Sequence, residues 1–307
     1  MNNMNSFENV ISVAENCSCA VKRDALLSEY TTFRTGGKSK AVITVKDVDS
    51  AVKVLESCKD NGVRVLIIGN GSNLLVSDSG FDGIVLRLTG SMNKIRYLGD
   101  GVIECQAGAT LASLCKTALE YSLTGLEFAY GIPGTVGGAV YMNGGAYGGE
   151  MKDVLLSAEH IRLSDLKRGE FNKDELSLSY RHSAYSDGGY LILGARLKLN
   201  EGKKEEIRSK MNDFLQRRND KQPLDLPSAG SVFKRPEGNF AGALIEQCGL
   251  KGYTIGGAQV SEKHAGFIVN IGGATTSDIL SLIKYIQKTV KDETGVFLEP
   301  EVKYIEG

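Results

Sequence analysis

The sequence predicts an α+β protein of two or three domains, and three observations support this class. At 307 residues the chain exceeds the usual size of a single domain. Segments with strand and helix periodicity alternate, with more strand than a doubly wound fold contains. Glycine accounts for 37 residues, about 12%, against a usual share of roughly 7%. Because prolines are few, these glycines indicate close backbone approach inside a folded protein.

The first part of the chain, residues 1–68, is predicted to form one strand–helix–strand unit. Residues 41–45 (AVITV) are predicted as a strand, and residues 47–61 as an amphipathic helix that ends before Gly62. The strand RVLIIG follows at 64–69. We interpret this unit as a small first subdomain.

The second part, residues 69–202, contains more strands than helices. Its predicted elements are a strand at 84–88, a hairpin at 95–108 turning at 99–101, a helix at 110–122, and strands at 154–163 and 190–199. A glycine-rich stretch at 125–149 is predicted as one long loop between them.

The third part, residues 203–297, is predicted to be mixed as well. It begins with a charged helix at 203–221 that connects it to the second part. A helix at 240–248, a strand at 266–270 and a helix at 277–294 follow, and Gly295 suits the left-handed position after a helix. A strand over 296–305 closes the chain.

Charge and composition exclude several classes of protein. Lys and Arg total 36 and Asp and Glu total 37, and this balance argues against a nucleic-acid partner. No stretch approaches the roughly 20 apolar residues of a membrane span, and no signal peptide is evident. Six cysteines without a C-x-x-C pair and three scattered histidines predict no metal site and a reducing compartment. We therefore expect a soluble cytoplasmic protein without a membrane partner.

Two glycine-rich segments are the candidate ligand sites. The first, GNGSN at 69–73, follows a strand and offers several backbone N–H groups that can cradle a pyrophosphate. A tight surface turn explains the same residues about equally well, and Leu74 breaks the dinucleotide-binding pattern. The second covers residues 131–150, of which eight are glycine. Loops this long are uncommon unless functional, which favours a large anionic ligand over a purely structural role.

Six further segments, together with the second glycine-rich segment, resemble the UDP-N-acetylenolpyruvoylglucosamine reductase family. In family order they are TTFRTGG (31–37), IIGNGSNLLVSD (67–78), YRHS (180–183), AGSVFKRP (229–236), GAQVSEKHAGFIVN (257–270) and LEPEVKYI (298–305). The resemblance spans nearly the whole chain. It implies two flavin-binding subdomains of the vanillyl-alcohol oxidase type, 1–68 and 69–202, and a substrate-binding domain at 203–297. The strand 298–307 is expected to return to the first subdomain.

The resemblance also implies a noncovalent FAD and NADPH as hydride donor. The residues expected at the flavin are Gly69, Asn70, Gly71, Ser72, Asn73, Leu74, Leu75, Gly131, Ile132, Pro133, Gly134, Thr135, Gly137, Gly138, Ala139, Asn143, Gly145, Ala146 and Tyr147. Neither histidine nor cysteine stands among them, so no covalent flavin link is expected.

By the same resemblance, Ser231 protonates the carbanionic intermediate at C2 of an enolpyruvyl ether, assisted by Arg181 and Glu301. Glu299 stands two residues before Glu301 and would share its side of a strand, but the family pattern favours Glu301. The residues expected at the substrate, including its diphosphate, are Lys221, Lys234 and Arg235.

Two departures from the family pattern and two alternatives remain. The chain resembles a shorter subclass that lacks a tyrosine-bearing insertion after the Y-R-x-S segment, and Arg235 stands where some members have Asn. A flavin-dependent sugar or lactone oxidase is one alternative, although it would leave the Ser–Arg–Glu set without a use. A flavin-binding protein without catalysis is the other.

Overall fold

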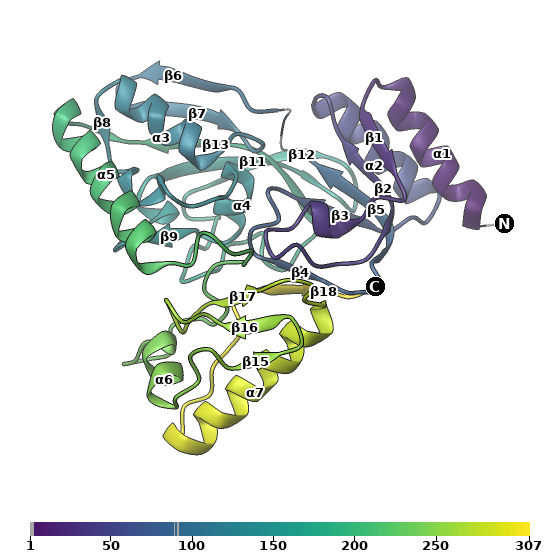
Figure 1. The fold of residues 1–307 in the computed structure, drawn as a ribbon. Helices are drawn as coiled ribbons and strands as arrows, with labels where there is room; N and C mark the ends of the chain where they lie inside the picture. The colour runs from purple at the N-terminus through teal and green to yellow at the C-terminus, as the bar shows by residue number, and fades with distance from the viewer. Residues whose placement is uncertain (1–2, 89, 91) are drawn as a thin grey trace. The chain divides into compact units, whose positions relative to one another are not determined.

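The computed structural model describes residues 3–88, 90 and 92–307 (Figure 1). They form an α+β fold, as predicted, and gather into two compact units. Unit 1 comprises Met1–Arg23, Ala41–Asn70 and Gly83–Arg217, and unit 2 comprises Asp24–Lys40, Gly71–Asp82 and Arg218–Gly307. Neither unit is a continuous stretch of sequence. The predicted division into residues 1–68, 69–202 and 203–297 stays a prediction.

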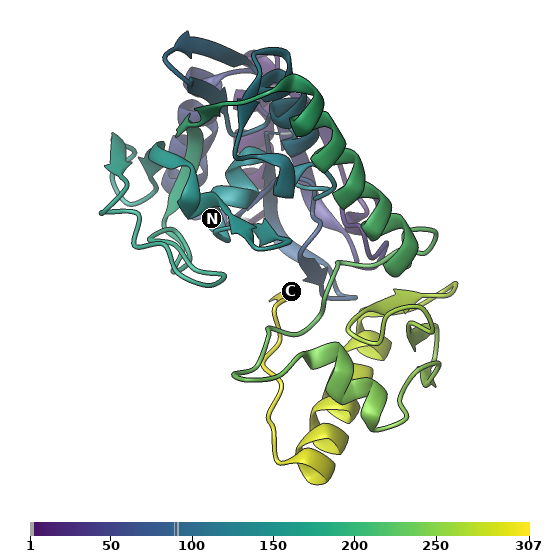
Figure 2. The same ribbon diagram turned by 90° about the vertical axis from the view of Figure 1, so that its left-hand side faces the viewer.

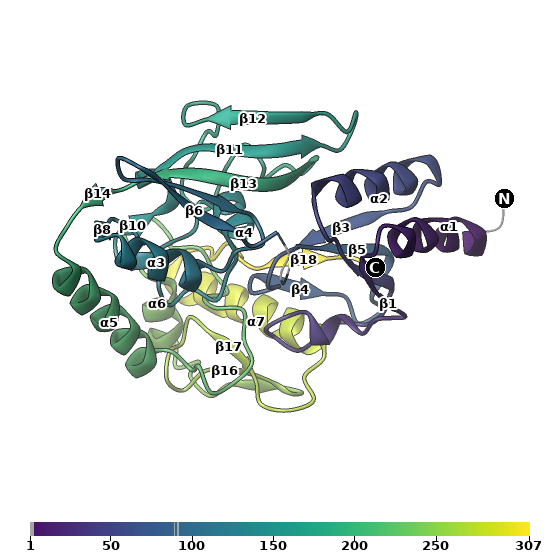
Figure 3. The same cartoon turned by 90° about the horizontal axis from the view of Figure 1, so that it is seen from above.

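A four-stranded sheet opens unit 1, with β1 (Ala20–Arg23), β2 (Ser39–Thr44), β5 (Phe81–Arg87) and β3 (Val65–Ile68) in that order. Helices α1 (Asn3–Asn16) and α2 (Val48–Asp60) lie side by side along this sheet (Figure 3). Asp47 begins α2, because its side chain accepts a hydrogen bond from the N–H of Ser50 and the Ser50 hydroxyl accepts one from Asp47. The predicted range of this helix, 47–61, is confirmed, since Asp47 and Asn61 are the capping residues of α2.

A five-stranded antiparallel sheet forms the larger part of unit 1. Its order is β12 (Arg168–Asn172), β11 (Leu155–Arg162), β13 (Tyr190–Lys198), β7 (Val102–Gln106) and β6 (Ile95–Gly99). The predicted hairpin turn is confirmed, since Gly99, Asp100 and Gly101 all have positive φ. Side chains alternate across β7, so Ile103 and Cys105 are buried while Glu104 lies on the charged opposite face.

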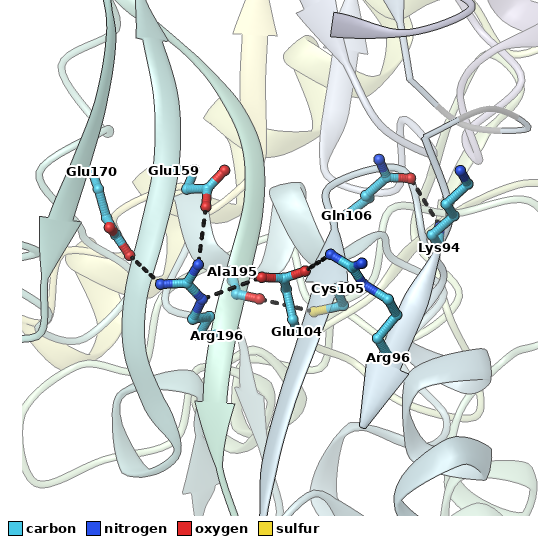
Figure 4. A network of polar contacts seen from close by, with 9 residues as sticks. All are labelled: Lys94, Arg96, Glu104, Cys105, Gln106, Glu159, Glu170, Ala195 and Arg196. Atoms are coloured by element: carbon cyan, nitrogen blue, oxygen red, sulfur yellow. Dashed lines mark hydrogen bonds and ion pairs between the residues drawn. The ribbon is translucent and has the colours of Figure 1, made fainter. Parts of the chain in front are cut away.

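That charged face carries an ion ladder that crosses the strands of this sheet (Figure 4). Arg196 lies within 3.3 Å of Glu104, 3.6 Å of Glu159 and 3.5 Å of Glu170. Arg96 also binds Glu104 and is the main reason why the pKa of that carboxyl lies below its ordinary value. Because these side chains are largely solvated, the ladder adds little to stability.

The glycine-rich stretch 125–149 is not one long loop, which corrects the prediction. It contains α4 (Val136–Tyr141) and the short strands β9 (Gly145–Ala146) and β10 (Gly149–Glu150), which pair with each other. A 3-10 turn precedes them at Glu127–Ala129 and another follows at Met151–Asp153. Thr135 caps α4, and Val136, Ala139 and Val140 bury one face of it. Tertiary packing therefore stabilises a helix despite two glycines of low helix propensity.

The other elements of unit 1 are α3 (Leu111–Glu120), which Thr110 caps, and β8 (Leu123–Thr124), which pairs with β14 (Asn200–Glu201). The predicted charged helix, α5 (Lys204–Lys221), follows and belongs to unit 1 as far as Arg217, with Ile207 and Met211 buried. The apolar core of unit 1 runs through both sheets and through α2, α3 and α4.

Unit 2 packs a small sheet against two helices. The sheet has the order β15 (Thr254–Ile255), β16 (Ala258–Val260), β17 (Ile268–Asn270), and α6 (Ala241–Gln247) lies beside α7 (Thr276–Thr294) (Figure 2). The unit also holds a 3-10 turn at Leu27–Glu29. An apolar stripe of α7 is buried, and Gly295 ends the helix with φ 74°, as predicted.

The end of the chain differs from the predicted strand over 296–305. Only β18 (Lys303–Ile305) is a strand, and it pairs in parallel with β4 (Leu74–Val76), which follows the first glycine-rich segment. Pro300 has no N–H to donate to a ladder, so a regular strand through this position is disfavoured. Val302 and Leu298 are buried in the core of unit 2.

Candidate active site

In unit 1, the first glycine-rich segment meets the second at Gly69. A Cβ added to Gly69 would lie 2.4 Å from the Thr135 hydroxyl, so only glycine permits this approach. The side-chain amide of Asn70 donates to the Pro133 carbonyl at 3.2 Å. Two segments that the sequence marked separately as flavin-binding therefore lie against each other.

In unit 2, the continuation of the first segment rests on the chain at residues 30–32. Gly71 has φ +62°, and a Cβ there would lie 2.0 Å from the Tyr30 carbonyl. Its own carbonyl accepts a hydrogen bond from the N–H of Thr32 at 3.3 Å. Among the described residues, the backbone N–H groups of Gly71 and Ser72 have no acceptor. They are therefore candidate donors to an anionic ligand, whereas the Leu75 side chain is fully buried in the core.

The second segment keeps part of its backbone donors for itself. The N–H of Gly137 donates to Ala107 at 2.9 Å, and the N–H of Gly138 donates to the Thr135 hydroxyl at 3.3 Å. Within the described part of the chain, the N–H groups of Gly131, Gly134 and Thr135 have no acceptor. Three donors left for a ligand thus lie just before α4. Ile132 is partly exposed beside them.

The last predicted flavin residues occupy the segment after α4. Asn143 is completely buried, whereas Gly145 and Ala146 form β9 and are partly exposed. Tyr147 has φ +52°, and its ring stacks on Phe214 of α5 with centroids 4.7 Å apart. The sequence did not single out Phe214 as a partner, although its apolar position in α5 was a signal.

Arg181 lies at the tip of a tight turn in unit 1. The backbone N–H groups of Ser179 and His182 each donate to the other residue's carbonyl at 3.1 Å. Arg181 has φ +56°, and its Nη2 donates to the Gly145 carbonyl at 3.1 Å. Its guanidinium also lies 5.1 Å from the ring centre of Tyr180. The predicted cation therefore rests on the segment that follows α4.

Ser231 and Glu301 are brought together in unit 2 by backbone contacts. The N–H of Glu301 donates to the carbonyl of Val232 at 2.7 Å. Ser231 forms a bridge with Phe267, and its hydroxyl donates to the carbonyl of Phe233 at 3.1 Å. Asn73 lies against the same place, because its side-chain amide donates to the Glu301 carbonyl at 3.2 Å. The predicted proton donor, the predicted carboxylate and the first glycine-rich segment thus converge within unit 2.

Glu299, the alternative carboxylate, has different contacts from Glu301. Its carboxylate binds the Lys234 ammonium, and its carbonyl accepts the Lys234 N–H at 2.8 Å. Residues 299 and 301 do not lie in a strand, so the shared side expected from strand alternation does not apply.

The remaining predicted substrate residues lie in unit 2. The guanidinium of Arg235 lies 4.0 Å from the ring centre of Phe240, which is 61% exposed. Lys221 is the last residue of α5 and is exposed. Its charge is one of the smaller contributions that lower the pKa of His264, after the dominant effect of burial.

Four cysteines of unit 1 are buried, namely Cys19, Cys58, Cys105 and Cys115. Burial raises the pKa of the Cys58, Cys105 and Cys115 thiols to about 12. They remain protonated at neutral pH and are poor nucleophiles. No helix in the described part of the chain is long and apolar enough to cross a membrane.

The glycine segments and the backbone donors fit a large anionic cofactor, and comparisons with known families agree. Residues 39–165 match the family described as "FAD binding domain". Residues 222–305 match "UDP-N-acetylenolpyruvoylglucosamine reductase, C-terminal domain". The protein Physcomitrella patens BBE-like 1 shares the fold, with a TM-score of 0.50 at 15% identity over 63% of this chain and 44% of its own. The fold is thus the flavin-binding type expected from the resemblance.

Relatives similar over nearly the full chain carry one name. UDP-N-acetylenolpyruvoylglucosamine reductase of Latilactobacillus sakei subsp. sakei is 50% identical over 285 residues, which cover 93% of each chain. That of Caldicellulosiruptor saccharolyticus is 45% identical over 287 residues, covering 92% of this chain and 91% of the relative. The crystal structure of the Thermus caldophilus reductase has a TM-score of 0.80 at 37% identity, covering 93% of this chain and 99% of that chain. The chain therefore belongs to the UDP-N-acetylenolpyruvoylglucosamine reductase family.

Proposed function

We propose that this protein is an NADPH-dependent flavoenzyme that reduces UDP-N-acetylglucosamine enolpyruvate to UDP-N-acetylmuramate, a step of peptidoglycan precursor synthesis. The observation that carries the proposal is the convergence of Ser231, Glu301 and Asn73 in unit 2. These backbone contacts support the assignment of Ser231 and Glu301 to one site beside a glycine segment of flavin-binding type. A family member with this arrangement has the groups that the reaction needs.

FAD is held by the backbone of the two glycine segments in this proposal. The N–H groups of Gly71 and Ser72 bind its pyrophosphate, and those of Gly131, Gly134 and Thr135 donate to other acceptors of the cofactor. The chemistry that FAD supplies when bound is the relay of a hydride from NADPH to C3 of the enol ether. Neither segment contains histidine or cysteine, which favours noncovalent binding.

Arg181 binds the carboxylate of the enolpyruvyl group in the proposed reaction. Addition of a hydride to an electron-rich enol ether leaves negative charge at C2, and the adjacent carboxylate shares it. A planar guanidinium can neutralise that charge through two parallel hydrogen bonds. A preorganised donor of this kind contributes about 3–4 kcal/mol to transition-state stabilisation.

Ser231 supplies the proton to C2, which completes the lactyl group. Serine is a weak acid, but the carbanion is a far stronger base, so the transfer is favourable. The hydroxyl then regains a proton from solvent. Glu301, in its protonated form, assists by donating a hydrogen bond to the same substrate carboxylate. Lys221, Lys234 and Arg235 bind the anionic part of the substrate.

The domain division, location and partners complete the proposal. Residues 1–68 and 69–202 form the flavin region, with 298–307 joining the first, and residues 203–297 form the substrate domain. All six cysteines are free, which favours a reducing compartment and hence the cytoplasm. The partner is a small-molecule substrate, and the near-neutral net charge of −1 gives no reason to propose a nucleic-acid partner.

Anaerobic mixing tests the function directly. The purified, flavin-loaded protein is mixed first with NADPH and then with UDP-N-acetylglucosamine enolpyruvate, while flavin absorbance is followed. Bleaching by NADPH and recovery on addition of the enol ether are expected. Recovery only after admission of air would replace this function with that of a flavin oxidase, and a purified protein that binds no flavin would exclude both.

A further inference from the structure

The N-terminal side of the Arg181 turn is held by a completely buried side chain, that of Asn143. Its Nδ2 donates to the Ser179 carbonyl and to Glu150 Oε2, both at 2.9 Å. Its Oδ1 accepts the N–H of Lys152 at 2.9 Å. Both amide hydrogens are therefore engaged, and none remains for a hydrogen bond to a flavin.

The C-terminal side of the same turn is held by Tyr141, two residues before Asn143. The hydroxyls of Ser183 and Ser186 donate to the Tyr141 carbonyl at 2.7 Å and 3.3 Å. The Tyr141 hydroxyl donates in turn to the Ser186 carbonyl at 3.0 Å. Tyr141 at the end of α4 and Asn143 just after it thus form hydrogen bonds to the turn on both sides of Arg181.

The backbone conformation shows why these hydrogen bonds are needed. Asn143 has φ +42° and Arg181 has φ +56°, a region that residues other than glycine seldom occupy. Strained positions of this kind persist when surrounding contacts hold them. Because Arg181 also donates to Gly145, both its backbone and its guanidinium depend on the segment around Asn143.

We propose that Asn143 is a positioning residue for Arg181, in place of the direct flavin contact that the sequence suggested. The inference rests on the proposed function, in which Arg181 binds the substrate carboxylate. Through the bond from Nδ2 to Ser179, Asn143 sets the place of the guanidinium relative to the flavin segment. Both belong to unit 1, so the coupling is internal to one compact unit.

Asn143→Asp is the first test, since it keeps the shape but removes both donors. The new carboxylate faces two acceptors, Glu150 Oε2 and the Ser179 carbonyl. We expect flavin content and NADPH-driven bleaching within about threefold of wild type, while reoxidation by the enol ether slows roughly 10–100-fold, as for a misplaced catalytic group. Loss of flavin, or an equal fall in both half-reactions, would overturn the proposal in favour of a flavin contact.

The double variant Asn143→Asp with Glu150→Gln separates positioning from stability. The amide introduced at position 150 can donate to the new carboxylate and restore the contact between positions 143 and 150, but the contact to Ser179 stays broken. We expect the thermal midpoint to recover while reoxidation stays slow. If reoxidation recovers together with the thermal midpoint, Asn143 is merely structural.

A mutant cycle with Arg181→Ala tests whether Asn143 acts through Arg181. In that background Asn143→Asp is expected to slow reoxidation less than about twofold, because the group it positions is gone. Full multiplication of the two effects would contradict the proposal.

Trypsin provides a readout that needs no turnover. Cleavage after Arg181, followed by mass spectrometry on the flavin-loaded protein, is expected to be about tenfold faster in Asn143→Asp than in wild type, because a released turn opens more often. An unchanged cleavage rate would contradict the claim that Asn143 holds the Arg181 turn in place. A wild-type protein that the enol ether cannot reoxidise would instead refute the proposed function and leave this readout intact.

Discussion

The two regions that carry the candidate catalytic groups are held by different kinds of contact. In unit 2, Ser231 and Glu301 are placed by backbone hydrogen bonds between the segments 231–234 and 299–301. In unit 1, Arg181 lies in a turn closed by backbone bonds between Ser179 and His182, but side chains, those of Asn143, Tyr141 and Ser183, attach that turn to the rest of the unit. Backbone bonds do not depend on which side chain a residue carries. Substitutions at Ser231 or Glu301 should therefore leave the backbone there in place, whereas a substitution at another residue, such as Asn143, can displace Arg181.

Ser231→Ala addresses the backbone-held region and should have the largest effect. The bridge to Phe267 does not need the hydroxyl, so the backbone should stay in place while the proton donor is lost. Flavin reoxidation by the enol ether is expected to slow by about 10²–10⁴-fold, the usual contribution of a placed general acid. Stopped-flow spectroscopy should show NADPH-driven bleaching unchanged. A parallel fall of both half-reactions would exclude the assigned role.

Arg181→Lys addresses the side-chain-held region. A lysine ammonium retains the charge but not the planar fork, and it cannot reproduce the bond to Gly145 with the same geometry. Reoxidation is expected to slow roughly 10²-fold, with NADPH-driven bleaching retained. Arg168→Lys is the matched control, because Arg168 lies in β12 and forms an exposed ion pair with Asp49. If both variants behave like wild type, Arg181 does not bind the carboxylate.

Asp278→Asn asks whether the backbone-held region depends on the cap of α7. Asp278 accepts the N–H of Thr275 at 2.9 Å, and that hydrogen bond is the main reason why its pKa lies below the ordinary value. Because folding lowers this pKa, the ionised Asp278 carboxylate stabilises the fold at pH values above the unfolded-state pKa of about 3.9. This contribution to stability is lost as the pH falls further. We expect the variant to be about 0.5–1 kcal/mol less stable at pH 7.

Urea unfolding at pH 7 and at pH 3 measures this effect. The difference between wild type and Asp278→Asn should shrink at the lower pH, since pH 3 lies below the unfolded-state pKa and part of the contribution of the lowered pKa is then lost. The ratio of the two half-reaction rates should stay unchanged at neutral pH. A difference in stability that is independent of pH would show that the charge of Asp278 is unimportant.

Glu104→Gln should have the smallest effect, because it touches only the solvated ladder in unit 1. The change weakens the pairs with Arg96 and Arg196 and is expected to lower stability by less than about 1 kcal/mol. Added salt should reduce the difference further, since exposed charges are screened. Urea unfolding at low and high salt checks this. A loss of several kcal/mol would mean that the ladder supports the sheet more than its exposure suggests.

The sequence identified many residues of the candidate site, but it did not predict which contacts they make. The sequence pointed to both glycine segments, and Gly69 indeed meets Thr135. It also suggested Ser231 and Glu301, which the backbone brings together from distant parts of the chain. It did not reveal that Asn143 has no free amide hydrogen or that Tyr147 stacks on Phe214. Such partners depend on which side chains the folded chain leaves within reach.

Local pattern by itself determined the elements whose hydrogen bonds are local. Helix α2 begins at Asp47, α7 ends at Gly295, and the hairpin turns at residues 99–101, because caps and turn glycines act within a few residues. Only the tertiary structure decided that α4 forms inside the glycine-rich stretch. It also decided that β18 pairs with β4 and that the turn of Arg181 rests on the end of α4. These features depend on burial and on long-range partners, which override local propensity.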